Sequence, residues 1–188
     1  MAEAFSNQVA RAAGIVTSYS GSTVAAGSTA ITVTALTGIG VSFLVDNQHF
    51  IAGTKVVATS AVSGGVGTVF TDRNSTNTAS ASSQVVRFLG PTTAYTSPAS
   101  TKSIIIGGTF ANNTNNSVNL SVEIYDSSVG VTSTGSAAIA SKIPIPAGSS
   151  FVISDTGKTL LESADELKVY CDSEGAVDVS LSILTGVS

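Results

Sequence analysis

The chain has 188 residues and a formal net charge of -4, and only 11% of its residues are charged. It contains one histidine, one cysteine and no tryptophan, so the side chains that usually perform acid–base, nucleophilic or metal chemistry are scarce. Because no basic stripe is present to neutralise phosphates, the composition argues against nucleic acid as a partner.

Targeting signals are absent from the sequence. Residues 1–13 carry Glu3 and Arg11 and lack an unbroken apolar core, so they do not form a secretory signal. No stretch approaches the roughly 20 apolar residues of a membrane helix. A lone cysteine cannot form an intrachain disulfide. We therefore expect a protein that is made in a reducing cytoplasm and has no membrane partner.

Residues 1–13 are expected to form an N-terminal arm. The apolar residues Ala4, Phe5, Val9 and Ala12 lie near one side at helical spacing, which predicts a short helix. A helix of this length is marginal alone, so we expect the arm to order against a neighbouring molecule, with Phe5 and Val9 as candidate subunit contacts. A frayed terminus is the alternative.

Residues 14–99 are expected to form a small β module. Short runs rich in Val, Ile, Leu and Thr are separated by glycine-containing turns, and no helix of useful length fits between them. The predicted strands are 15–19, 30–35, 41–45, 55–60, 67–71 and 84–89.

Residues 34–89 contain the segments LTGIGVSFLVDNQHFIAGTKVVATS, GTVFTDRNSTNTAS and QVVRFLG. These segments resemble a module that recurs in phage virion proteins. Gly53 permits a turn before Thr54, and Val56 and Val57 then enter the next strand.

Residues 90–102 contain two of the four prolines and show no hydrophobic alternation. This composition is typical of a linker, and we place the domain boundary near Ala99. The second domain then covers residues 100–188.

The second domain has clearer alternation. In residues 118–125, apolar side chains alternate with polar ones, which predicts a strand with one buried face. Residues 167–171 and 177–183 are expected to form a hairpin around the turn 172–175. The other predicted strands are 103–110, 137–145 and 150–153. The whole predicts an antiparallel β-sandwich of the Ig-like or jelly-roll type.

Residues 102–186 contain KSIIIGGTFANNTNNSVNLSVEIYDSS, SKIPIPAGSSFVIS and DELKVYCDSEGAVDVSLSIL. This succession resembles a C-terminal β-sandwich of tailed-phage structural proteins, including those of T4-like cyanophages. Pro146, Ala147 and Gly148 match a turn of that domain, and Asp165 opens its penultimate strand. The resemblance implies a virion protein and an aquatic host.

The residues that could take part in chemistry are better explained by structural roles. His49 lies in a polar turn with no second histidine to complete a two-histidine metal site. Cys171 has the core-facing parity of Leu167 and Val169 and is expected to be inert. The acidic loop 162–166 could bind calcium or hydrolyse glycosides, but it is favoured as a solvated rim. We predict no catalytic, cofactor or metal residues.

The segment IPIPAG has prolines at two alternate positions. Pro144 and Pro146 have no backbone N–H to donate to neighbouring strands, so the segment cannot be a central strand paired on both sides. This predicts an edge strand or the approach to a turn. An edge strand is a place where a neighbouring subunit can add, so Ile143, Pro144, Ile145 and Pro146 are further candidate subunit contacts.

The combined expectation is a non-enzymatic structural component of a tailed-phage virion, assembled in the cytoplasm of a bacterial host. Capsid decoration or cementing is the leading assignment, and a neck or tail component is the alternative. The expected partners are major capsid or neck and tail proteins and other copies of the chain, forming a homo-oligomer. A receptor- or carbohydrate-binding module of a tail fibre is a rival, disfavoured by an aromatic content of 6%. An enzyme is the third option.

Overall fold

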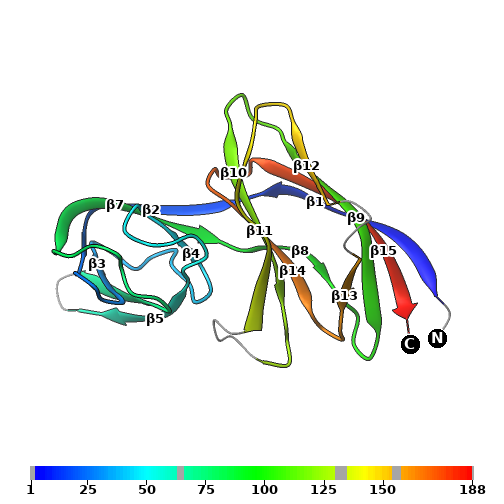
Figure 1. Cartoon of the computed structure of the whole chain (residues 1–188), viewed down its shortest axis with the longest axis horizontal. Coiled ribbons are helices and arrows are strands. Elements are labelled where there is room, and N and C mark those ends of the chain that lie inside the picture. The colour runs from blue at the N-terminus through cyan, green and yellow to red at the C-terminus, as the bar shows by residue number, and fades with distance from the viewer. Residues whose placement is uncertain (1–2, 63–65, 130–134, 154–157, 188) are drawn as a thin grey trace. The chain divides into compact units, whose positions relative to one another are not determined.

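The computed structural model describes residues 3–62, 66–129, 135–153 and 158–187 (Figure 1). In these residues the chain forms fifteen β-strands in three antiparallel sheets and no α-helix. The all-β prediction is confirmed. No helix within the described ranges has the length and apolar character needed to cross a membrane.

The chain divides into two compact units. Among the described residues, unit 1 comprises the chain up to Ile15 and from Pro91 onward, and unit 2 comprises Val16–Gly90. Unit 2 is therefore inserted between the first strand of unit 1 and the remaining ones. The sequence placed the boundary near Ala99, whereas the chain enters unit 1 for the second time between Gly90 and Pro91.

Two of the sheets belong to unit 1. Sheet A has the strand order β1 (Ala4–Ala13), β15 (Val177–Val187), β9 (Lys102–Asn112) and β12 (Ser150–Ile153), and β13 (Thr159–Leu161) also pairs with β9. Sheet C has the order β11 (Ser136–Ile145), β10 (Val118–Tyr125), β14 (Glu166–Cys171) and β8 (Thr92–Thr96).

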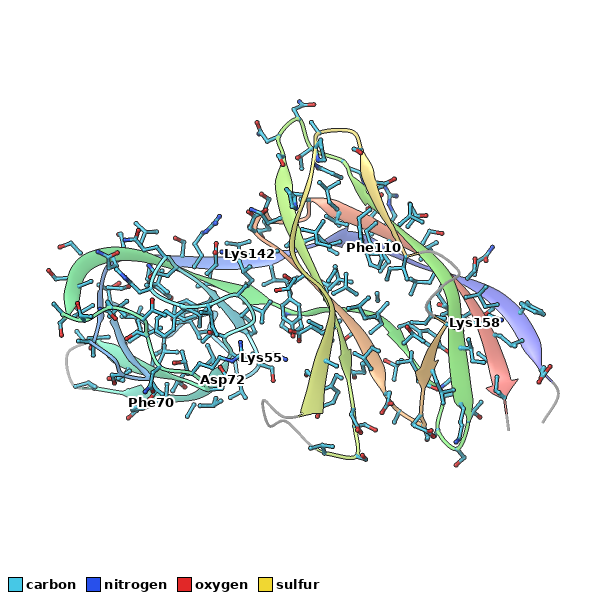
Figure 2. The ribbon with its side chains drawn as sticks, in the orientation of Figure 1. Lys55, Phe70, Asp72, Phe110, Lys142 and Lys158 are labelled. Atoms are coloured by element: carbon cyan, nitrogen blue, oxygen red, sulfur yellow. The ribbon has the colours of Figure 1, made fainter. Side chains whose placement is uncertain are left out.

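Both sheets of unit 1 contribute to one hydrophobic core. Phe110 of β9 and Leu181 of β15 come from sheet A, and Leu120 of β10 and Val169 of β14 come from sheet C. All four side chains are buried, and Phe110 is labelled in Figure 2. Strands β9 and β15 have the period-two alternation of burial that turns one face to the core, and unit 1 is two β layers over shared apolar side chains.

The N-terminal segment forms a strand, and the predicted helix is wrong. Strand β1 pairs antiparallel with β15, with Phe5 opposite Leu184 and Val9 opposite Ser180 (Figure 1). Residues 1–2 of the predicted arm lie outside the described residues. A short isolated helix is only marginally stable, whereas β15 supplies backbone partners to the whole segment, and this tertiary pairing outweighs local spacing.

The hairpin predicted for the last two strands is also wrong. Strand β14 pairs with β10 and β8 in sheet C, whereas β15 pairs with β1 and β9 in sheet A. The turn between them therefore crosses from one layer to the other. The predicted inward faces are confirmed, since Leu167, Val169, Cys171, Val177 and Leu181 are all buried. Alternation reveals which face is buried but does not identify the partner strand.

The segment expected as a linker contains strand β8, which the sequence analysis did not predict. Ala94 and Tyr95 are buried in the core of unit 1. The Tyr95 hydroxyl lies 2.9 Å from Ser103 Oγ, within hydrogen-bond distance. Among the described strands, β8 pairs only with β14, so its other edge has no neighbouring strand. An edge strand is less buried than a central one, and its hydrophobic pattern in the sequence is therefore weak.

Unit 2 is one curled sheet, sheet B. Its strand order is β4 (Leu44–Asp46), β7 (Ala81–Gly90), β2 (Ile15–Val24), β3 (Ala30–Val33), β6 (Gly67–Thr71) and β5 (Val56–Ala61). The two ends of this order approach each other, because Leu44 forms a bridge with Lys55 and Ser42 N donates to the Val56 carbonyl at 2.8 Å.

The concave side of sheet B holds the core of unit 2. Ile31, Val69 and Phe88 are fully buried there. Gly53 has a φ of +82°, so the turn predicted at this glycine is confirmed. Because the curled sheet encloses its own core, unit 2 needs no second layer.

Candidate interaction surface

No cluster of chemical side chains forms a catalytic or metal centre in the described part of the chain. No group of three or more His, Cys, Asp and Glu side chains there can hold a metal ion. His49 lies in a turn, where its backbone N donates to Asn47 Oδ1 at 2.9 Å and its carbonyl accepts from Thr76 N at 2.8 Å. These contacts give the histidine backbone a structural role.

Cys171 is a core residue. It is fully buried among the apolar side chains shared by sheets A and C. Burial raises the pKa of the Cys171 thiol, which keeps it protonated at neutral pH. A protonated and inaccessible thiol is a poor nucleophile.

The acidic loop 162–166 forms hydrogen bonds and an ion pair within unit 1. The Asp165 carboxylate accepts hydrogen bonds from Ser127 N at 3.0 Å and from Glu162 N at 2.9 Å. The Glu162 carboxylate lies 3.1 Å from Lys102 Nζ. These oxygens are engaged by groups of the same unit, which supports a structural role for the loop.

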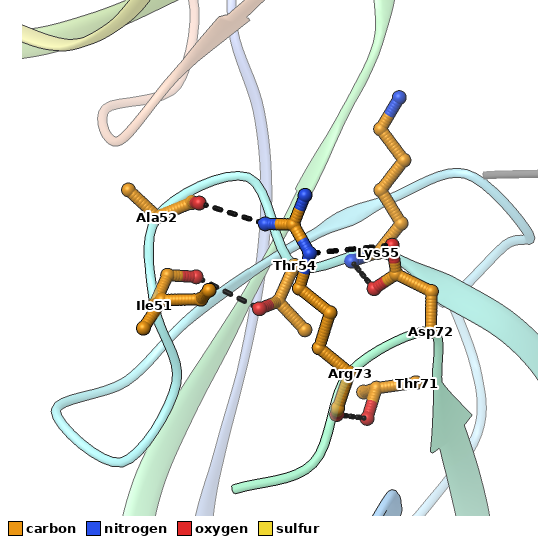
Figure 3. A network of polar contacts seen from close by, with 7 residues as sticks. All are labelled: Ile51, Ala52, Thr54, Lys55, Thr71, Asp72 and Arg73. Carbon is orange, nitrogen blue, oxygen red and sulfur yellow. Dashed lines mark hydrogen bonds and ion pairs between the residues drawn. The ribbon is translucent and has the colours of Figure 1, made fainter. Parts of the chain in front are cut away.

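A polar network in unit 2 joins the turn before β5 to the end of β6 (Figure 3). The Asp72 carboxylate accepts a hydrogen bond from Lys55 N at 2.7 Å and lies 3.9 Å from Arg73 Nε. Arg73 Nη1 donates to the Ala52 carbonyl at 3.2 Å. These contacts lie within unit 2, and they hold the turn against the neighbouring strand.

The most distinctive surface is the face of sheet A that points away from the core. Its side chains come from β1, β15, β9, β12 and β13, and strand register places them in three rows. The first row is Phe5, Leu184, Ile104 and Leu160; the second is Asn7, Ser182 and Gly107; the third is Val9, Ser180, Thr109 and Val152. We call these residues the neutral face, because none is charged.

Several large apolar side chains of the neutral face are exposed. The exposed fraction is 78% for Phe5, 71% for Val9, 54% for Val152 and 48% for Leu160. Scattered single apolar residues are ordinary on a protein surface, but here they lie in register on one sheet face. An exposed apolar surface of this kind is typical of a contact site.

Charged residues surround the neutral face: the exposed Lys158, two residues before Leu160, stands at its β13 margin, and ion pairs lie at its two ends. Beyond the Val9 row, Arg11 Nε lies 3.7 Å from the Asp178 carboxylate. Beyond the Phe5 row, Lys102 pairs with Glu162. An uncharged centre inside a charged rim matches the depletion of charged residues at the core of protein interfaces.

The free edge of β1 borders this face. Strand β1 stands at the end of the sheet order and pairs only with β15 among the described strands. Phe5, Asn7 and Ser182 help to line a shallow hollow of about 270 Å³ beside this edge. The predicted contacts Phe5 and Val9 thus lie on the same exposed surface.

The other predicted contacts lie on β11 at the edge of sheet C. The edge position predicted for this segment is confirmed, and Ser149 N donates to the Pro146 carbonyl at 3.1 Å in the predicted turn. Ile145 is buried in the core and Ile143 packs against it, whereas Pro144 and Pro146 are exposed. The structure therefore places this group on a different sheet from Phe5 and Val9.

The neutral face cannot be recognised without the pairing register of the strands, which the sequence does not give. Leu160 and Val152 are single apolar residues in short strands, and Leu184 and Ile104 lie in longer apolar runs. Each becomes part of one face only when strands far apart in the chain are paired.

Unit 2 has a polar pocket of about 390 Å³. It is lined by Asp46, Asn47, Gln48, Gln84, Val85 and Arg87. The Asp46 carboxylate pairs with the Arg87 guanidinium, and Asn47 Nδ2 donates to the Val85 carbonyl at 3.0 Å. The pocket offers amide and guanidinium groups but no aromatic ring.

The chain matches no protein-family model, no curated protein and no solved structure.

Proposed function

We propose that the chain is a non-enzymatic structural subunit of a tailed-phage virion that works through repeated contacts between subunits. The observation that carries the contact role is the neutral face of sheet A, with Phe5 and Val9 strongly exposed. The tailed-phage assignment rests on the resemblance of residues 34–89 and 102–186 to virion domains.

We propose that unit 1 is a β-sandwich of the Ig-like or jelly-roll type, the architecture that the resemblance implies. Two layers over one core support it. Such sandwiches serve many functions, so the function is argued from the surface and not from the fold.

Within the particle, capsid decoration or cementing is the leading assignment, and a neck or tail position is the alternative. A contact repeated by particle symmetry gains strength through multivalency, so each single contact need not be strong. An uncharged face flanked by ion pairs suits such a contact, because close packing against a neighbour places no charge in the buried centre.

Cryo-electron microscopy of the intact particle tests this proposal. Density for the chain in many copies over the icosahedral surface is the expected result. Density confined to the neck or tail would replace the decoration assignment by the alternative. Mass spectrometry of purified particles that detects no copy of the chain would overturn the virion assignment altogether.

The polar pocket of unit 2 favours a second candidate function, a receptor- or carbohydrate-binding module of a tail fibre. Its Asn47, Gln48, Gln84 and Arg87 side chains carry the donors and acceptors that sugar hydroxyls bind. A glycan array with the full chain tests it, with Gln84→Ala as the matched variant. Specific micromolar binding that Gln84→Ala abolishes would support this candidate, and an empty array would remove it.

A further inference from the structure

We propose that the neutral face of sheet A binds the same face of a second copy of this chain across a two-fold axis. This inference rests on the proposed role as a structural subunit and names its partner. The alternation of large and small side chains on the face and the position of its charges favour a second copy as the partner.

The rows of the neutral face alternate in size. The Phe5 row carries four large apolar side chains, whereas the next row consists of Asn7, Ser182 and Gly107. Successive side chains on one face of a strand are two residues apart, so these rows are about 7 Å apart. The first row is a ridge and the second is a valley.

A ridge beside a valley is complementary to itself. Consider a two-fold axis that lies in the interface, runs across the strands and passes between the Phe5 and Asn7 rows. It places the Phe5 row of each copy over the Asn7 row of the other, so both ridges enter valleys at once. This reciprocity is the property of a two-fold contact.

The hollow beside β1 lies where this packing requires space. It has a volume of about 270 Å³ and is lined by Phe5, Asn7 and Ser182 together with Ser6 and Ile183. The axis described above directs the Phe5 ring of the second copy to this hollow. An aromatic side chain in a pocket is the usual anchor of a protein interface.

The charge pattern also favours a second copy as the partner. A two-fold contact brings each residue near a copy of its own surface, so a charged face would meet like charge. The three rows of the neutral face carry none, and the ion pairs Arg11–Asp178 and Lys102–Glu162 lie beyond them. The Phe5 and Asn7 rows at the centre of the contact therefore bring no like charges together, and Lys158 stands at the β13 margin of the contact.

The extent of the overlap suits a weak, reversible dimer. The axis described above places the three rows of one copy over the Asn7 row, the Phe5 row and the rim beyond Phe5 of the other. About seven residues of about 3.4 Å on each of four strands about 4.8 Å apart then overlap, or roughly 450 Å². Two such faces bury roughly 900 Å² in total, below the range of about 1,200–2,000 Å² for stable interfaces and typical of a transient contact.

Sedimentation velocity of the full chain over a wide concentration range tests the inference. We expect a reversible monomer–dimer equilibrium in the wild type. In the Phe5→Asp variant, the dissociation constant should rise about 100-fold, because each copy loses the ring that the axis directs into the hollow of the other and places a charge there instead. Phe5 is strongly exposed, so this change leaves the unit 1 core intact.

Ile51→Asp is the matched control, because Ile51 is 53% exposed and lies in a turn of unit 2. It should leave the dimer unchanged. Circular dichroism verifies that both variants are folded. A wild type that remains monomeric at high micromolar concentration, or a dimer that Phe5→Asp does not weaken, would overturn the inference.

Cross-linking tests the axis itself. Phe5→Cys and Asn7→Cys chains, mixed and treated with a short bis-maleimide, should form the mixed dimer, whereas the buried Cys171 stays unmodified. Absence of the mixed dimer would rule out this axis. These outcomes are independent of the proposed function: a monomer found in virions refutes only the dimer, and a dimer absent from virions refutes only the virion role.

Discussion

The two sheets of unit 1 share one core but differ on the faces that point away from it. The neutral face of sheet A carries no charge. The corresponding face of sheet C carries Glu123 and Tyr125 on β10, opposite Lys168 and Glu166 on β14, with Tyr170 on the same side. Similar alternating strands therefore produce two chemically different surfaces.

The polar groups of sheet C pair with one another. Lys168 Nζ lies 3.1 Å from the Glu166 carboxylate and 3.7 Å from the centre of the Tyr125 ring. Burial raises the pKa of Tyr170, and so do the charge of Glu123 and its hydrogen bond to the tyrosine. The groups on this face thus have partners within the chain, whereas the apolar side chains of the neutral face remain exposed to solvent.

The largest expected effect separates the two faces of sheet A. Phe110→Ala should lower the free energy of unfolding by about 3–5 kcal/mol, because it removes a fully buried ring from the shared core. Phe5→Ala, the same substitution on the neutral face, should change it by less than about 0.5 kcal/mol. Urea unfolding followed by tyrosine fluorescence measures both, and equal losses would contradict the assignment of the two faces.

The next effect concerns the residue that follows β1. Gly14 has a φ of +128°, and a Cβ added there would overlap the Ser173 carbonyl oxygen. Gly14→Ala should therefore destabilise unit 1 by about 2–3 kcal/mol. Gly107→Ala is the control, because its added Cβ would approach no atom closer than 3.5 Å. If the two variants melt together, β1 does not enter sheet A as described.

A smaller effect depends on pH and on sheet C. Because the pKa of Tyr170 is raised, the folded protein binds this proton more tightly than the unfolded chain does. The resulting stability is fully present below the usual tyrosine pKa of about 10 and is lost as the pH rises above it. The unfolding free energy of the wild type should therefore decrease above about pH 10.

Tyr170→Phe is the matched variant for this pH effect. It lacks the ionisable hydroxyl, so its unfolding free energy should decrease less steeply over the same alkaline range. Urea titrations at a series of pH values give both slopes. Identical slopes would show that Tyr170 does not carry the effect.

The smallest effect is expected at the rim of the neutral face. Glu162→Gln removes the ion pair with Lys102. The side chain of Glu162 is 56% exposed and that of Lys102 is 45% exposed. Exposed pairs contribute little, so thermal melting should show a loss below about 0.5 kcal/mol. A loss several times larger would mean that this rim is part of the structural core of sheet A.

Strands with strong local patterns were predictable. Residues 67–71 and 150–153 are strands with the predicted bounds, and the alternation in 118–125 marks β10. Val69 of β6 and Leu120 of β10 lie on buried faces. Burial of every second side chain leaves a period-two pattern in the sequence.

Edge strands were not predictable in the same way. Local patterns predict a helical arm at β1 and a linker at β8, and they predict no strand at β13. Each stands at the margin of its sheet or pairs with a single neighbour. Only part of such a strand is buried, as for Leu161 beside the exposed Leu160, so its local pattern is weak.

Within the neutral face, the sequence predicts only Phe5 and Val9 as contacts, and it does so through helical spacing and not through strand pairing. Helical spacing and the lack of a local core suggested that they contact a neighbour. The strand places both on one face because residues 5 and 9 differ by an even number of positions. The remaining members of the neutral face carry no local mark of their shared position.

The sequence alone determined the all-β class and the inward faces of the central strands, because both depend on alternation within a few residues. Tertiary structure alone decided which strands pair. Strand β1 joins β15 from the opposite end of the chain, and β14 and β15 enter different sheets although they are adjacent in sequence. Pairing is settled by long-range backbone hydrogen bonds and shared core volume, which no local pattern encodes. The neutral face exists only as a result of that pairing.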